Sequence, residues 1–250
     1  MSTRRVVTAA LTATAAAALV TALTVPSAPA TRGEPAGRCH GLAVTLAGAT
    51  PADDQIFGTA GPDVVDGLGG DDRIYGMGGD DVLCGGAGDD AVHGDAGDDA
   101  VFGGDGDDLL HGNDGDDVLG GSAGFDRVHG DAGDDLLHSG GGRGSSADRA
   151  PSQLFGGDGD DVLDGSAGRD SLQGGAGDDL LRGDAGADSL SDTDGHDRLR
   201  GGTGDDVLRA RDASPPGPAD DRLDAELGHD TCLRDAADAA TGCERLLAPV

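Results

Sequence analysis

The chain has no tryptophan and no lysine, and it has only one tyrosine and four phenylalanines among 250 residues. So few aromatic side chains exclude the large core of an ordinary globular domain. Glycine supplies 48 residues. The chain has 48 acidic residues and 17 arginines, which gives a formal net charge of -31. Nucleic acids and anionic membrane surfaces are poor partners because the charge repels them, so cations are the expected counterpart.

The first thirty residues have a different composition. Arg4 and Arg5 form a positively charged start, residues 6–23 are apolar, and Ala28-Pro29-Ala30 has the form of a cleavage site. These features predict a signal peptide over residues 1–30 and a secreted, extracellular protein without a membrane span after cleavage. An uncleaved membrane anchor is the alternative. The paired arginines leave the export route open between the general and the twin-arginine pathways.

A nine-residue repeat occupies most of the remaining chain. Nine units run without a gap over residues 58–138, and six more run over residues 156–209. In all fifteen units the fourth residue is Gly, the sixth is Asp and the eighth is Val, Leu or Ile. The first residue is Gly in fourteen units, and Asp192 is the exception. Such regularity predicts a repeat architecture in which every unit folds alike.

Each invariant position has a physical reason. Glycine at the first and fourth positions allows positive φ angles and lets backbone carbonyls approach an ion closely. Aspartate at the sixth position supplies the hard oxygen donor that Ca²⁺ prefers. The aliphatic eighth residue lies between two outward residues, which predicts a three-residue strand with one side chain pointing inward. Each unit is therefore predicted to form one turn and one short strand.

The pattern G-G-x-G-x-D-x-U-x resembles the RTX, or haemolysin-type, calcium-binding repeat, over roughly residues 49–233. The resemblance implies an all-β fold, a right-handed parallel β-roll (a β-helix solenoid) in which two units make one coil. It also implies that each Ca²⁺ lies between the turn of one unit and that of the second unit along, about eleven ions in all. The implied carboxylate ligands are Asp63, Asp72, Asp81, Asp90, Asp99, Asp108, Asp117, Asp126, Asp135, Asp161, Asp170, Asp179, Asp188, Asp197 and Asp206.

Some turns depart from the repeat close to the expected ion. Phe125, Arg169, Ala187 and His196 replace the common Asp at the fifth position, so their turns carry less negative charge. Asp192 replaces the first Gly, and the geometry of that turn is therefore in doubt. These turns are expected to bind Ca²⁺ more weakly.

The array has predicted caps and one interruption. Residues 31–57 and 210–250 are expected to cap its ends, because an open solenoid end exposes strand edges. Degenerate units extend the register over residues 49–57 and 225–233. The Gly/Ser-rich residues 139–155 are predicted to form a loop on a continuous coil, and two rolls joined by a linker are the alternative.

Four cysteines lie near the ends of the array. Export places them in an oxidising compartment, where four cysteines allow three disulfide pairings. We expect Cys39 to pair with Cys84 and Cys232 with Cys243, since each bridge would close a modest loop at one end of the array. Free thiols or a metal site are the alternatives.

The thin core predicts that the fold depends on calcium. One aliphatic residue in nine buries too little apolar surface to offset the backbone entropy lost on ordering the array. Stacked carboxylates add charge repulsion. Bound Ca²⁺ is expected to supply the missing stabilisation, so the chain should be largely disordered without it and should fold cooperatively as calcium rises.

Two further motifs bear on chemistry. The G-x-S-x-G sequence around Ser122 straddles two units and lacks the strand-turn-helix context of a nucleophile, so no catalytic role is expected. His93, His111 and His129 share the ninth position in every second unit, with Tyr75 ahead of them. This spacing predicts an exposed column of surface histidines, and a transition-metal site is the alternative.

The expected function is calcium binding without catalysis. The stretches outside the array are too short for the protease or lipase domain that often accompanies such repeats, so we expect no enzyme. The alternative is an extracellular adhesion or accessory module that uses the Ca²⁺-loaded roll to bind a protein or glycan.

Overall fold

The computed structural model describes most of the repeat array and parts of both ends of the chain. All regular structure in the described residues is β-strand, and no helix among them has the length and hydrophobicity needed to span a bilayer. The described residues are 5–8, 38–39, 42–46, 49–140, 150–210, 221–234 and 238–247.

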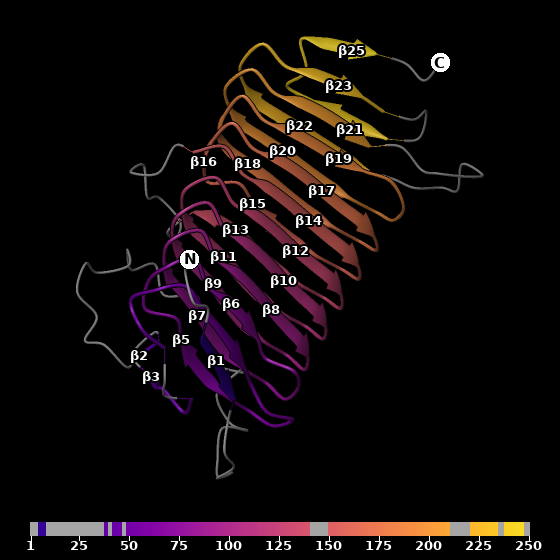
Figure 1. Ribbon diagram of the computed structural model, residues 1–250. Helices are drawn as coiled ribbons and strands as arrows, with labels where there is room; N and C mark the ends of the chain where they lie inside the picture. Colours follow the sequence, from indigo (N-terminus) through magenta and orange to yellow (C-terminus); the bar gives the residue numbers. More distant parts are fainter. Residues whose placement is uncertain are drawn as a thin grey trace.

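Two long sheets share the array by taking alternate strands of the chain (Figure 1). The first sheet has twelve strands, in the order β1 (Arg5–Thr8), β4 (Asp54–Phe57), β6 (Arg73–Tyr75), β8 (Ala91–Ala96), β10 (Leu109–Asp114), β12 (Arg127–Ala132), β14 (Gln153–Asp158), β17 (Ser171–Ala176), β19 (Ser189–Asp192), β21 (Val207–Ala210), β23 (Thr231–Leu233) and β25 (Arg245–Leu247).

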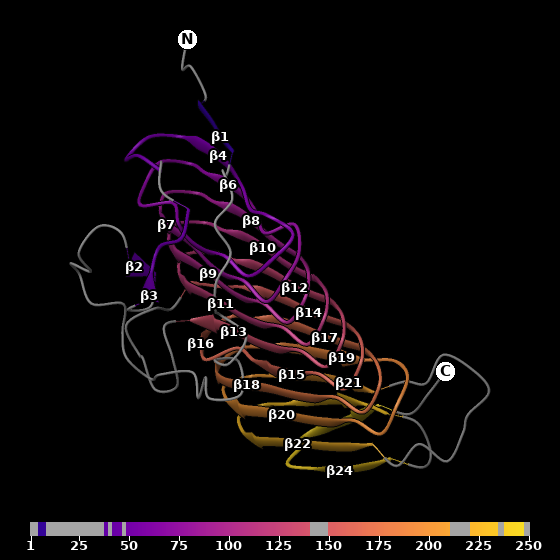
Figure 2. The same cartoon turned by 90° about the horizontal axis from the view of Figure 1, so that it is seen from below.

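The second sheet has eleven strands and lies opposite the first (Figure 2). Ten of its strands follow in the order β5 (Val64–Asp66), β7 (Val82–Ala87), β9 (Ala100–Asp105), β11 (Val118–Ala123), β13 (Leu136–Gly140), β15 (Val162–Asp164), β18 (Leu180–Gly186), β20 (Arg198–Thr203), β22 (Arg222–Leu227) and β24 (Ala239–Thr241). The short strand β16 (Ala167–Gly168) also pairs with β18, and β2 (Arg38–Cys39) forms an antiparallel hairpin with β3 (Leu42–Ala43).

All pairs within the two sheets are parallel, and their register is that of two repeats per coil. Leu110 in β10 lies opposite Val92 in β8 on one side and Val128 in β12 on the other. Each partner is the eighth residue of the second unit along, so one coil contains two nonapeptides, as predicted. The chain therefore forms a parallel β-roll, and Figure 2 shows its successive coils.

The core is the eighth residue of each unit. Leu110, Leu119 and Val128 are at most 1% exposed, and the aliphatic residues of the other coils join them in one cluster between the sheets. Most strands in the middle of the array have six residues, where three were predicted. They are longer because the first three residues of the next unit also pair with the neighbouring coil, as Asn113 does with Asp131.

The roll continues across the interruption between the two runs of repeats. Strand β12 pairs with β14, where Val128 lies opposite Leu154, and β13 pairs with β15. One roll is therefore present, and the alternative of two rolls is wrong. Ser139 and Gly140 belong to β13 and residues 153–155 to β14, so both ends of the Gly/Ser-rich stretch continue the sheets. Residues 141–149 lie outside the described residues.

Disulfides join the chain near both ends of the array. Cys39 in β2 pairs with Cys84 in β7, and Cys232 in β23 pairs with Cys243, which confirms both predicted bridges. Of the predicted signal peptide, Arg5–Thr8 forms β1 and pairs with β4, the first strand of the array. The apolar stretch and the cleavage site lie outside the described residues.

Candidate metal centres in the turns

The sixth-position aspartates form a ladder of buried carboxylates along each edge of the roll. All fifteen are at most 6% exposed. The backbone N–H of Asp90 donates to Oδ1 of Asp108 at 2.9 Å, and that of Asp108 donates to Oδ1 of Asp126 at 3.1 Å. The same bond recurs from coil to coil and fixes each carboxylate inside its turn.

The second oxygen of these carboxylates is buried without a hydrogen-bond donor in most turns. A buried carboxylate oxygen without a partner is strongly unfavourable, and a bound cation is one way to satisfy it. The residues whose Oδ2 is in this state are Asp72, Asp81, Asp90, Asp99, Asp108, Asp117, Asp135, Asp161, Asp179, Asp188 and Asp206.

These Oδ2 atoms line a small space beside the first-position glycine, which we call the turn cradle. A Cβ added to Gly103 would overlap Oδ2 of Asp108 and would lie 2.8 Å from the carbonyl oxygen of Gly121. Gly121 is the first residue of the second unit along, so each cradle lies between units n and n+2. Carboxylate and backbone carbonyl oxygens are the donor set that Ca²⁺ takes, and the cradles therefore fit this ion.

The glycines act differently from the prediction. Positive φ angles occur at the fourth position, as in Gly106 (φ 144°), and at the second position, as in Asn113 (φ 81°) and Asp131 (φ 78°). First-position glycines such as Gly103 do not have them. The prediction of positive φ at the first position is therefore wrong. Glycine is needed there because a Cβ would fill the turn cradle.

Burial raises the pKa values of the ladder carboxylates. Desolvation is the main cause and repulsion by neighbouring aspartates adds to it, while the backbone hydrogen bond opposes both. The pKa rises to about 8 for Asp81 and Asp117, and to about 7 for Asp90, Asp99 and Asp108. These carboxylates would thus hold protons near neutral pH unless a cation kept them ionised.

Asp192 brings an additional carboxylate into one turn. Asp192 keeps the strand register opposite Ala210, but Thr193 at the second position lacks the positive φ of residues such as Asp184, so the turn differs from its neighbours. Carboxylate oxygens of Asp179, Asp192 and Asp197 lie within 4.8 Å of one another, and all three residues are buried. A Cβ at Gly174 would overlap Oδ2 of both Asp179 and Asp192. Asp192 therefore gives this cradle a second carboxylate.

Sequence reasoning missed part of the ladder. Ser152 and Asp221 occupy the sixth position in degenerate units, where Ser152 donates its N–H to Oδ1 of Asp170 at 2.8 Å. An aliphatic residue two positions later, Leu154 or Leu223, was the signal that could have found them. The stacked aspartate pairs beyond the two predicted runs are Asp54–Asp72, Asp135–Asp161, Asp197–Asp221 and Asp206–Asp230.

The two other sequence motifs lie outside the cradles. Ser122 has the second-position φ of 85° and lies within strand β11, so it follows the repeat pattern. His93, His111 and His129 form a stacked column on the first sheet. The predicted column is therefore present, but its rings are half-buried where exposed rings were expected.

A parallel β-roll whose turns are lined by buried carboxylate oxygens defines a class of solenoid that binds cations between its coils. Comparison with family models makes the assignment specific. The model of the RTX calcium-binding nonapeptide repeat (4 copies) matches residues 49–83, 75–110, 85–119, 111–145, 155–190 and 191–213. The chain therefore belongs to this family and is a calcium-binding repeat protein. No match was found among curated proteins.

Proposed function

We propose that this chain is a secreted protein without catalytic activity whose β-roll folds around Ca²⁺ held in the turn cradles. The buried Oδ2 atoms, each beside a glycine that has no Cβ, carry the proposal. The fifteen sixth-position aspartates named above are the proposed carboxylate ligands. Bound Ca²⁺ would neutralise the stacked carboxylates and replace their lost hydration.

Two kinds of residue supply the oxygen atoms of each cradle. The sixth-position Asp accepts a backbone hydrogen bond at Oδ1 and directs Oδ2 into the cradle. The first-position residue of unit n+2 turns its carbonyl oxygen toward the same space, as Gly130 does beside Gly112. With the additional carboxylate of Asp192, the cradle beside Gly174 is proposed to bind more tightly than its neighbours.

Secretion is supported by two independent features. Residues 1–30 have the composition of a signal peptide, and both disulfides suit an oxidising compartment. After cleavage β1 would be absent from the mature protein, and β4 would become the edge strand of the first sheet. Disulfide Cys39–Cys84 would still hold the β2–β3 hairpin against the array.

Calorimetric titration with Ca²⁺ tests the proposal. Along one edge the carboxylate ladder continues from Asp135 to Asp161, so we expect one cooperative transition that takes up about eleven ions, and up to about four more from the additional pairs. Mg²⁺ should not substitute for Ca²⁺, because it requires shorter bonds and octahedral geometry. Absence of calcium uptake, or equal uptake of both ions, would contradict the proposal.

A cluster of arginines favours a second candidate function, the binding of an anionic partner. A cavity of about 250 Å³ on the second sheet is lined by Leu180, Arg182, Arg198, Arg200, Arg222 and Asp224. Arg182 lies opposite Arg200, and Arg198 lies opposite Arg222. Asp164 lies opposite Arg182 and Asp224 lies opposite Arg200, so the four arginines keep a surplus of two positive charges. Nη1 of Arg182 is also buried without a hydrogen-bond acceptor. We propose that this cavity binds a sulfated or carboxylated glycan.

Binding of a sulfated oligosaccharide to the Ca²⁺-loaded protein tests the second function. Arg200→Ala should weaken binding by about tenfold, as expected for loss of a charged hydrogen bond. Arg209→Ala makes the same charge change on the first sheet and should leave the affinity unchanged. Equal effects of the two variants would show non-specific attraction. Inorganic sulfate and an uncharged oligosaccharide, tested alongside, separate recognition of the anion from recognition of the sugar.

A further inference from the structure

A column of stacked rings crosses the first sheet outside the turn cradles. Neighbouring ring centroids are 4.5 to 5.2 Å apart, and the ring planes differ by at most 11°. The column exists because ninth-position residues of every second unit lie directly above one another in the parallel register. Its members are Phe57, Tyr75, His93, His111, His129 and Phe155.

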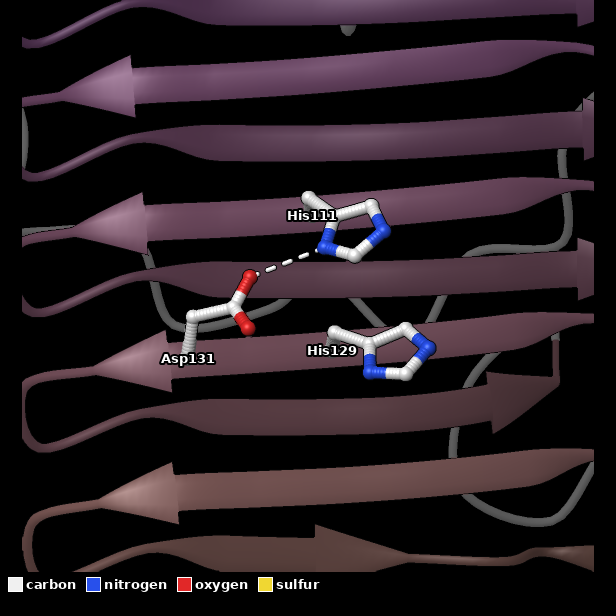
Figure 3. Close-up of side chains that lie close together, drawn as sticks. All are labelled: His111, His129 and Asp131. Atoms are coloured by element: carbon white, nitrogen blue, oxygen red, sulfur yellow. Dashed lines mark hydrogen bonds and ion pairs between the residues drawn. The ribbon is translucent and has the colours of Figure 1, made fainter.

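The carboxylate of Asp131 lies close to two histidines of this column. Asp131 follows His129 by two positions on β12, and its positive φ of 78° belongs to the second position of the repeat. Its Oδ2 lies 2.8 Å from Nδ1 of His111. Figure 3 shows the Asp131 carboxylate facing nitrogen-bearing edges of both rings, and one potential ligand atom from each residue lies within 4.8 Å of the others.

The chemistry of this cluster differs from that of the cradles. Two imidazoles and one carboxylate suit a borderline divalent ion such as Zn²⁺, whereas Ca²⁺ takes oxygen ligands. Burial lowers the pKa of His129, the neighbouring His111 lowers it further, and the Asp131 carboxylate raises it. The side chains of His111 and Asp131 are 24% and 41% exposed, so an ion can reach them from solvent.

We propose that His111, His129 and Asp131 form a binding site for a divalent transition metal such as Zn²⁺, separate from the calcium sites. One ligand atom of each residue lies within 4.8 Å of the others, so a bound ion would draw the three side chains closer together. Three protein ligands leave the fourth tetrahedral position for water or an external ligand. The site lies on two adjacent coils, so a bound metal would also link β10 to β12.

A second pair of stacked histidines in the column serves as a comparison for the proposed site. His93 and His111 stack in the same way, with ring centroids 5.0 Å apart. The residue that corresponds to Asp131 one coil earlier is Asn113, which lies opposite Asp131 in the register. An amide is a far poorer metal ligand than a carboxylate, so this pair is not proposed to bind.

Zn²⁺ titration of the protein in excess Ca²⁺ tests the site, because Ca²⁺ then occupies the turn carboxylates. We expect one tight equivalent, and we expect His129→Gln and Asp131→Asn each to lower the affinity by at least about tenfold. His196→Gln is the matched control, since its ring lies 3.3 Å from Asp178 on the surface, outside the proposed site. Circular dichroism in Ca²⁺ should be the same for every variant.

A double variant gives the sharper test. In the His129→Gln background, Asn113→Asp places a carboxylate beside the His93–His111 pair and should restore Zn²⁺ binding. Restored affinity would support coordination by two stacked imidazoles and one carboxylate. Equal Zn²⁺ affinity in the unmodified protein and His129→Gln, or no restoration by Asn113→Asp, would overturn the proposal.

Discussion

Removal of Ca²⁺ with a chelator is expected to abolish most of the β-sheet circular dichroism of this protein. Without the ion, each coil would stack buried carboxylates such as Asp99 and Asp117 with no counter-charge. The core cannot compensate, because each nonapeptide contributes one buried aliphatic side chain. Addition of millimolar Ca²⁺ should restore the spectrum in one cooperative transition. An unchanged β spectrum in chelator would contradict calcium-dependent folding.

Acidification should partly replace calcium in the same experiment. The pKa of Asp81 and Asp117 is about 8 in the folded, metal-free chain, against an ordinary value of 3.8 that applies to the unfolded chain. The folded state therefore binds more protons between about pH 4 and pH 8, and its stability rises as the pH falls through this range. The chelated protein should regain β structure between pH 8 and pH 5. Loss of β structure on acidification would contradict this sign.

Gly112→Ala is expected to destabilise the array and to remove one metal site. The new Cβ would lie 2.8 Å from the carbonyl oxygen of Gly130 and would overlap Oδ2 of Asp117. The carbonyl belongs to a strand that is paired on both sides, so it cannot move away. We expect a loss of about 2 to 3 kcal/mol in the free energy of unfolding and the loss of one Ca²⁺ from the calorimetric count.

Gly78→Ala is the matched control for this substitution. Gly78 occupies the third position, where alanine is common in other units, and its Cβ would meet only the carbonyl oxygen of Ala96 at 3.6 Å. The free energy of unfolding should change by less than about 0.5 kcal/mol, with full calcium uptake. If both variants behave alike, the first-position glycine does not shape a metal site.

The sequence was sufficient to predict the roll because its pattern is local and repeated. The inward residue at the eighth position and the Gly at the fourth restrict each unit to one turn and one strand pairing. The register of Leu110 with Val92 and Val128, two units apart in each direction, follows from this restriction. The sixth-position Asp was placed for the same reason. Its burial and backbone hydrogen bond were then consequences of stacking.

Features that depend on the neighbouring coil could not be predicted from one unit. The first-position glycine is needed because of a carbonyl on the next coil, and a single nonapeptide does not contain that contact. The contribution of Asp192 is similar, since the cradle it enters belongs to Gly174 and Asp179. Ser152 and Asp221 were missed because their units lack the glycines and are recognisable only by their stacking partners.

The ladder tolerates extra residues within a coil. Most stacked carboxylates are separated by two complete units of sequence, as Asp90 and Asp108 are. Asp135 and Asp161 are instead 26 residues apart, and Asp197 and Asp221 are 24 residues apart. Eighth-position residues nevertheless still lie opposite each other across these coils, as Val128 and Leu154 do and as Leu199 and Leu223 do. The strand register is thus set by the pairing of each coil with its neighbour and not by the number of residues in the coil. The roll is therefore a modular scaffold, in which insertions at either edge can vary while its axial spacing is preserved.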